Sequence, residues 1–142
     1  MTHGLDTSFL VAVEVSSHEE HAGCRARFQK LLKAEDTFSL APQILAEFIH
    51  VVTDPRRFAS PLTLEQAIER AEIWWNAAEV VHVFPTAEST LLFLGWLEEH
   101  KLGRKRLLDT MLASTLQANG VTSVLTLNRS DFTLFGNFTF PK

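Results

Sequence analysis

The sequence predicts an α/β protein in which strands and helices alternate. Short apolar segments that end in a turn are each followed by a longer segment with apolar residues at helical spacing. The chain has 142 residues, 46% of them hydrophobic and 21% charged, which is the balance of an ordinary domain with a buried core. No internal repeat, low-complexity tract or linker interrupts it. We therefore expect residues 1–142 to form one α/β domain rather than a helical bundle or a β-sandwich.

The predicted strands are short apolar segments bounded by turn residues or by the next helix. The first is very short and centres on residues 4–5. The last precedes Pro141 and suits only a short edge strand, because proline cannot continue a ladder of hydrogen bonds. The expected strands are residues 4–5, 37–41, 80–84, 121–127 and 138–140.

Capping signals predict where the helices between these strands begin. Ser17 with Glu20, and Thr63 with Gln66, form capping boxes at the starts of two helices. Pro42 suits the first turn of another helix, whose apolar stripe follows at helical spacing. The expected helices are residues 17–33, 42–53, 63–78, 86–101 and 107–119.

Three of these helices end at residues that do not continue a helix. Asp54-Pro55 ends the second helix, because proline disfavours the helical conformation of the residue before it. A loop at residues 56–61 follows. Gly103 and Gly120 follow the last two helices, and each lies where a left-handed helix cap is expected.

The chain has no feature of a membrane or secreted protein. No apolar run reaches the about eighteen residues that cross a bilayer, and the N-terminus lacks a basic stretch followed by an apolar signal region. Cys24 is the only cysteine, so no intramolecular disulfide is expected. These features predict a cytoplasmic protein without membrane association.

The net charge of −4 argues against binding of nucleic acid by bulk electrostatics, which needs several cations to neutralise phosphates. Basic residues cluster only at Arg56-Arg57 and at Arg104-Lys105-Arg106. If the substrate is RNA, Arg56, Arg57, Arg104 and Arg106 are the candidates for contact with its backbone. The alternative is that both patches are solvated loop charges.

The positions of certain acids are the most informative feature of the sequence. Asp6, Glu47 and Asp109 each interrupt an apolar segment, whereas Asp131 lies in a polar loop. An ionised carboxylate is costly to remove from water unless it is paired, hydrogen-bonded or bound to a metal. Acids at such places therefore need a partner.

The predicted topology provides a common location for these acids. Asp6 follows the first strand, Asp131 lies just beyond the fourth, and Asp109 begins the helix that leads to the fourth strand. Glu47 borders the apolar stripe of a helix that also follows a strand. Ligands of open parallel sheets bind beyond the carboxyl ends of the strands, where the strand order reverses. If the first and fourth strands are neighbours, the acids converge there.

Each acid also has a purely structural explanation. In this explanation Asp6 caps the following helix, Asp109 is a first-turn acid favoured by the helix dipole, and Asp131 forms an Asx turn. Glu47 lies in the middle of a helix, where capping does not apply, so a salt bridge to Arg or Lys is its structural alternative.

The acids and their neighbours form an ordered set of short motifs: Gly4-Leu5-Asp6-Thr7-Ser8-Phe9-Leu10, Ala46-Glu47-Phe48, Leu108-Asp109-Thr110-Met111-Leu112-Ala113 and Thr126-Leu127-Asn128-Arg129-Ser130-Asp131-Phe132. This set resembles the PIN-domain ribonucleases, and within them the VapC-type toxins of bacterial toxin–antitoxin pairs. The segment at residues 53–58 also resembles a loop of a subgroup of these toxins.

The resemblance implies a parallel sheet of about five strands flanked by helices. It also implies RNA cleavage with Mg²⁺ or Mn²⁺, a homodimer and a cognate antitoxin protein. Carried over residue by residue, the catalytic acids are Asp6, Glu47, Asp109 and Asp131. Asp6 and Asp109 would bind metal directly, and Asp131 directly or through water.

Ser8, Thr126 and Asn128 are candidates to support these ligands by hydrogen bonds, with a turn or cap as the alternative. Ser8 departs from the Asn often found at this position in the family. It also argues against a phosphatase with Asp6 as nucleophile, which needs a second Asp there. The six histidines form no zinc pattern. The remaining rival is a catalytically inactive PIN-like module that binds RNA or protein.

Overall fold

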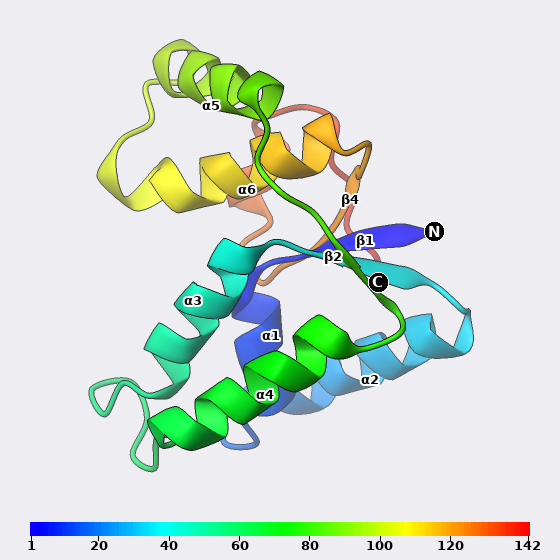
Figure 1. Ribbon diagram of the computed structural model, residues 1–142, viewed down its shortest axis with the longest axis vertical. Helices are drawn as coiled ribbons and strands as arrows, with labels where there is room; N and C mark the ends of the chain where they lie inside the picture. The colour runs from blue at the N-terminus through cyan, green and yellow to red at the C-terminus, as the bar shows by residue number, and fades with distance from the viewer.

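The computed structural model of the chain describes residues 1–142 and contains a four-stranded parallel sheet between two layers of helices (Figure 1). The strands are β1 (Thr2–Leu5), β2 (Thr37–Leu40), β3 (Val80–His82) and β4 (Ser123–Leu125). The helices are α1 (Thr7–Glu14), α2 (His21–Lys33), α3 (Pro42–Val52), α4 (Leu64–Asn76), α5 (Ala87–Glu99), the 3₁₀ turn η1 (Arg104–Arg106), α6 (Leu107–Ala118) and α7 (Ser130–Thr133).

The strand order β3-β2-β1-β4 creates a switch point beside β1. From β1 the chain adds β2 and then β3 on one side, and β4 later returns to the other side of β1. Gly4 pairs with Val124 and Leu5 with Leu125, so the carboxyl ends of β1 and β4 lie together. The expected neighbourhood of the first and fourth strands is confirmed, and the sheet has the crevice in which open α/β proteins bind ligands.

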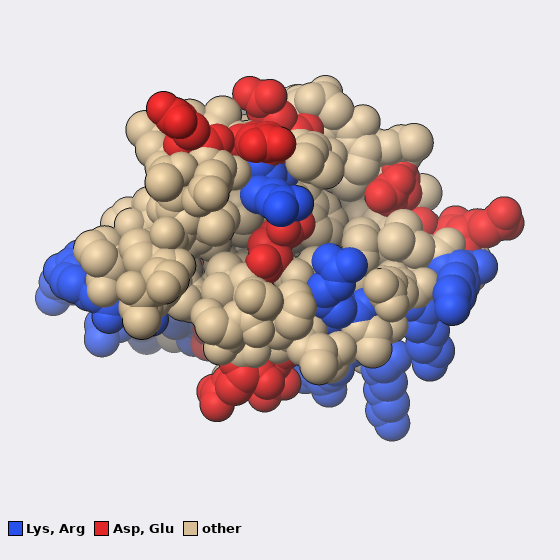
Figure 2. All heavy atoms as spheres, turned by 90° about the horizontal axis from the view of Figure 1, so that it is seen from below, with Lys and Arg blue, Asp and Glu red and all other residues tan.

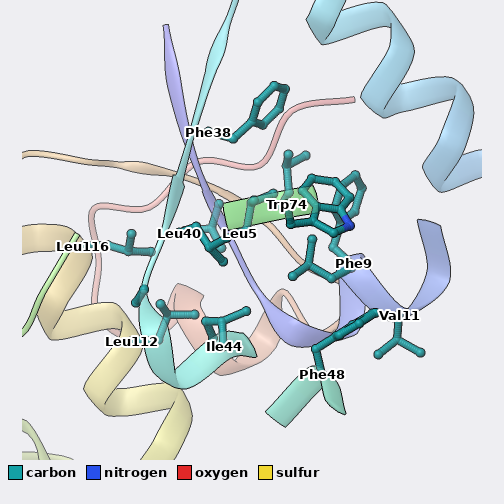
Figure 3. Close-up of a cluster of buried hydrophobic side chains, with 14 of the residues drawn as sticks. Leu5, Phe9, Val11, Phe38, Leu40, Ile44, Phe48, Trp74, Leu112 and Leu116 are labelled. Atoms are coloured by element: carbon teal, nitrogen blue, oxygen red, sulfur yellow. The ribbon is translucent and has the colours of Figure 1, made fainter. Parts of the chain in front are cut away.

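Helices cover both faces of this sheet. In Figure 1, α1 to α4 lie on one side of the strands, and α5 and α6 on the other. Figure 3 shows Leu112 and Leu116 of α6 on one side of β1 and β2, with Phe9 and Trp74 on the other. Gly4 leaves room for this packing, since a Cβ there would lie 2.5 Å from a Leu116 methyl group. None of the helices combines the length and apolar character needed to cross a bilayer.

The α/β class is confirmed, but the sheet has four strands instead of about five. At the expected fifth strand only Thr139 pairs with the sheet, through a single bridge to Ser123. β4 is only three residues long, so it offers little edge to pair with. Pro141 has no N–H with which to extend the pairing.

The start of α2 differs from the prediction based on Ser17. The helix begins at His21, and no side chain caps it. The backbone N–H of Glu20, which a capping box would direct to Ser17, donates instead to Nδ1 of His18 at 3.0 Å. The capping box of Thr63 and Gln66 at α4 is confirmed.

The two glycine caps also have different outcomes. Gly120 has a φ of +74°, and Val121 N–H bonds to the carbonyl of Leu116, so this cap is confirmed. Gly103 has a φ of −144° and is therefore not a left-handed cap of α5. Lys101, at a φ of +54°, takes the left-handed position at the end of α5 in its place.

Candidate active site

Asp6 follows β1 at the switch point and is held by two hydroxyl groups. Ser8 Oγ donates to Asp6 Oδ2 at 2.9 Å, and Thr126 Oγ1 donates to the same oxygen at 2.6 Å. These hydroxyls accept backbone N–H groups of Leu127 and Asn128, respectively, so their protons are directed to the carboxylate. The arrangement leaves Asp6 Oδ1 without a side-chain hydrogen bond. Ser8 and Thr126 thus orient the Asp6 carboxylate through hydrogen bonds.

The Asp6 carboxylate is buried, with 5% of the residue exposed. Burial raises its pKa, although the hydrogen bonds from Thr126 and Ser8 oppose this rise. Asp6 is the N-cap residue of α1, but its side chain makes no capping hydrogen bond. The structural alternative for Asp6 is therefore wrong.

Glu47 and Asp109 are half-buried acids from α3 and α6. Burial and the charge of Asp6 raise the pKa of Glu47 to about 7, against the opposing influence of the Thr7 hydroxyl. That hydroxyl is buried and makes no hydrogen bond of good geometry. No Arg or Lys pairs with Glu47, so the salt bridge proposed as its structural alternative is absent.

Asp109 has a pKa raised to about 7, first by burial and then by the charge of Asp6. The nearby carboxyl group of Asp131 and the charge of Glu47 raise it further. One carboxyl group thus responds to the other three, so the four acids form a single electrostatic cluster. Asp109 also lies in the first turn of α6, where the helix dipole favours an acid. Its structural explanation as a first-turn acid therefore applies as well as its membership of the cluster.

Asp131 lies in the first turn of the short helix α7 and is paired with Arg106. Nη2 of Arg106 donates to the backbone carbonyl of Asp131 at 2.7 Å, and Nε lies 3.7 Å from Oδ1. Arg106 is only 26% exposed at its side chain. Of the arginines expected to contact RNA, Arg106 is thus engaged by the acid cluster.

A cavity of about 590 Å³ opens over Asp6, Glu47 and Asp109, and Ser8 and Asn128 also line it. Figure 2, a view from below Figure 1, shows Asp and Glu atoms next to Lys or Arg atoms on that side of the molecule. Asp131 belongs to the cluster but does not line the cavity.

The three remaining arginines differ in their relation to the cavity. Arg57 lines it, whereas the Arg56 side chain is 86% exposed and is not part of the wall. Arg104 is exposed and makes no ion pair. The structure therefore brings one arginine, Arg57, to the cavity that contains the acids.

Two further lining residues, His18 and Phe58, were not among the expected site residues. Periodicity gives no signal for either, because both lie in loops. Phe58 ends the segment at residues 53–58, whose resemblance to a toxin loop was the only available indication.

The donor atoms around the cavity are carboxylate and hydroxyl oxygens, which are the ligands that Mg²⁺ and Mn²⁺ accept. No three His, Cys, Asp or Glu side chains are placed so that they hold a metal ion together. Because Mg²⁺ keeps several waters and takes one or two carboxylates, the donor set nevertheless fits such an ion.

The three-layer fold and the carboxylate cavity at the switch point place this protein among the α/β proteins with an open parallel sheet and an acidic ligand site. Within that class, the chain belongs to the PIN domain family, whose family model matches residues 5–134.

Relatives of known name agree with this assignment. The chain is 28% identical over 116 residues to ribonuclease VapC43 of Mycobacterium tuberculosis, which covers 82% of this chain and 68% of that protein. The VapC ribonuclease Mb2897 of Mycobacterium bovis matches to the same extent.

Solved structures share the fold. VapC20 of Mycobacterium tuberculosis, described as a Sarcin-Ricin loop cleaving toxin, superposes with a TM-score of 0.72 at 17% identity, covering 96% of both chains. VapBC-1 of nontypeable Haemophilus influenzae gives a TM-score of 0.69 at 16% identity, covering 100% of this chain and 98% of the other.

Proposed function

We propose that this protein is a metal-dependent endoribonuclease and acts as the toxin of a type II toxin–antitoxin system. The observation that carries the proposal is the cluster of Asp6, Glu47, Asp109 and Asp131 at the switch point, in which each of three acids raises the pKa of Asp109. Membership of the PIN domain family and the similarity to VapC ribonucleases support the reaction class.

Mg²⁺ or Mn²⁺ is the proposed cofactor. Asp6 and Asp109 would bind it directly, with Asp131 bound directly or through water. When bound, a divalent cation supplies an acidified water and neutralises charge at the scissile phosphate. The cluster supports this proposal, because burial and mutual repulsion raise the pKa values of Glu47 and Asp109, and a cation between the carboxylates would offset the repulsion.

The protein's own residues have separate tasks in this proposal. Ser8 and Thr126 hold one oxygen of Asp6, which keeps the other directed to the cavity. Glu47 lines the cavity without an Arg or Lys partner, so its carboxylate would be free to accept a proton from the attacking water. Asn128 borders the same space and supplies an amide for a substrate oxygen or a water.

We infer the partners and location from the same resemblance. The VapBC structures that share the fold support a cognate antitoxin protein, and the RNA substrate follows from the proposed reaction. A homodimer and a cytoplasmic location complete the proposal, without membrane association.

The second candidate function is a PIN-like module that binds RNA or protein without cutting. This alternative does not explain why all four acids are retained in one cluster, since unpaired buried carboxylates destabilise a fold that makes no use of them.

Cleavage of RNA by the purified protein tests the proposal. Mg²⁺ or Mn²⁺ should support cleavage, and EDTA should abolish it. Asp6→Asn and Asp109→Asn should each remove most activity while the protein stays folded, as judged by circular dichroism, because only charge is lost. Metal-independent cleavage, or full activity in both variants, would reject this site. RNA binding without cleavage would favour the inactive module.

A further inference from the structure

The cavity extends beyond the acids to a wall of different chemical character. His18 comes from the loop between α1 and α2, and Arg57 and Phe58 come from the loop between α3 and α4. We call these three residues the loop wall. It combines a hydrogen-bond donor, a cation and an aromatic ring beside an acidic cluster.

The hydrogen bonding of His18 fixes which of its ring nitrogens faces a ligand. Nδ1 accepts the backbone N–H of Glu20 at 3.0 Å, so the neutral ring carries its proton on Nε2. Nε2 has no partner in the protein. His18 is partly buried and lines the cavity, and it therefore offers one N–H donor to a molecule bound there.

Arg57 is held at the wall by a rigid turn. The Asp54 carboxylate accepts the backbone N–H of Arg56 at 2.9 Å, and the Asp54 carbonyl accepts those of Arg57 and Phe58. Arg57 Nε lies 3.6 Å from Asp54 Oδ2, which orients the guanidinium while 58% of the side chain stays exposed. The cation is thus positioned but still available.

Phe58 is packed on one side and open on the other. It contacts the hydrophobic core and also lines the cavity, so its ring cannot turn away from the wall. Glu19 also lines the cavity next to His18, and its exposed side chain is screened by solvent. A phosphate is therefore favoured at the Arg57 side.

We propose that the loop wall is a subsite for one unpaired nucleotide next to the scissile phosphate. In this subsite the base stacks on Phe58 and the phosphate pairs with Arg57. An acceptor atom of the nucleotide accepts a hydrogen bond from Nε2–H of His18. Single-stranded RNA is recognised by stacking of unpaired bases on aromatic rings, and a cavity of about 590 Å³ is in the range of small-molecule sites. The subsite rests on the proposed ribonuclease function and specifies its substrate as unpaired RNA.

The two neighbouring arginines provide the first test. Binding of a fluorescein-labelled oligouridine is measured by anisotropy on the Asp6→Asn protein, which is not expected to cut it. Adding Arg57→Ala should lower the slope of log affinity against log salt by about 0.7, the value for one phosphate on a single strand. Arg56→Ala removes the same charge from the same loop outside the wall, and it should change the slope little. Equal effects of the two substitutions would overturn the assignment of Arg57.

Stacking on Phe58 is tested with a strand that lacks bases. Phe58→Leu keeps an apolar side chain against the core but removes the flat ring, and Phe58→Trp keeps a ring. Phe58→Leu should weaken oligouridine binding by about tenfold and leave binding of an abasic ribose–phosphate strand nearly unchanged. Phe58→Trp should retain the preference for the strand with bases. The same loss for both strands in Phe58→Leu would overturn stacking.

The role of His18 is tested with two amides. His18→Asn places an acceptor near the position of Nδ1 and so keeps the bond to Glu20 N–H, but it lacks the donor at Nε2. His18→Gln places a donor near Nε2. RNA affinity should fall in the Asn variant and recover in the Gln variant, whereas a purely structural role for His18 would give the opposite order.

The outcomes separate this inference from the nuclease proposal. If the wild-type protein cleaves RNA while Arg57 and Phe58 behave like their controls, the subsite is wrong and the nuclease stands. If the wild-type protein binds oligouridine with the expected pattern but cleaves no RNA, the subsite stands and the nuclease is wrong. Absence of RNA binding would reject the subsite.

Discussion

Replacing Asp109 by Asn keeps the shape of the side chain and removes one charge from the acid cluster. The pKa of Asp109 is raised from 3.8 to about 7 by burial, by Asp6 and by Asp131. The folded protein therefore holds this proton more tightly than the unfolded chain. The corresponding stability is complete below pH 4 and is lost as the pH rises through about 7. Above that pH the ionised carboxylate destabilises the metal-free fold, and Asn should relieve the repulsion.

The expected gain in folding stability of Asp109→Asn is the difference between two opposing effects. A difference of about three between the two pKa values corresponds to roughly 4 kcal/mol. Asp109 is half-exposed, and solvent screening reduces this figure to about 1–2 kcal/mol. Loss of a first-turn acid from α6 costs about 0.3–1 kcal/mol of helix-dipole stabilisation. The net effect of Asp109→Asn is a gain on the order of 1 kcal/mol, or roughly 3–4 °C in Tm for a chain of this size.

Thermal unfolding in EDTA, followed by circular dichroism at pH 8 and at pH 5, measures this effect. The rise in Tm should be clear at pH 8 and smaller at pH 5, where folded Asp109 is already protonated. Asp54→Asn is the control of opposite sign. Backbone N–H donation from Arg56 lowers the pKa of Asp54, so its replacement should reduce Tm at pH 8. A lower Tm for Asp109→Asn at pH 8, or equal changes at both pH values, would refute the electrostatic reasoning.

Three further predictions also concern the stability of the fold. Mn²⁺ at a hundredfold excess over its dissociation constant should stabilise the wild-type protein by about 2.7 kcal/mol, and Asp109→Asn should lose most of this increment; no shift in the wild type would contradict a metal site. Thr126→Val removes a hydroxyl from buried Asp6 and should cost roughly 1–3 kcal/mol in urea unfolding, whereas an unchanged midpoint would show that Asp6 does not need this donor. Gly4→Ala should cost about 1–3 kcal/mol, because fully buried Leu116 cannot move aside; a neutral substitution would contradict this packing.

The location of the acids was predictable because it rests on local sequence and on topology. Asp6, Glu47 and Asp109 interrupt apolar segments, and an acid in such a place requires a partner. The rule for parallel sheets then predicts where they meet, and the pairing of β1 with β4 confirms the topology. The role of these acids as metal ligands stays a prediction.

Several features of the fold could not be predicted, because they depend on contacts between distant segments. α1 is buried at six of its eight positions, so it has no polar face and no helical stripe to detect. The pairing of Arg106 with Asp131 depends on how η1 meets α7, whereas the sequence suggested only an RNA contact or a solvated loop charge for Arg106. Of the loop wall, the sequence predicted only Arg57 as a possible RNA contact, since the orientation of His18 depends on one backbone hydrogen bond.

The hydrogen bond between Thr126 and Asp6 joins residues that are 120 positions apart in the chain. During translation Asp6 leaves the ribosome long before Thr126 is made, and until then β1 lacks its neighbour β4. A growing chain therefore has neither the complete set of acids nor the hydroxyl that orients the first of them. A message that is truncated upstream of these residues yields a chain without Asp131 and without the hydroxyl of Thr126. The assembled site therefore exists only after most of the message has been read.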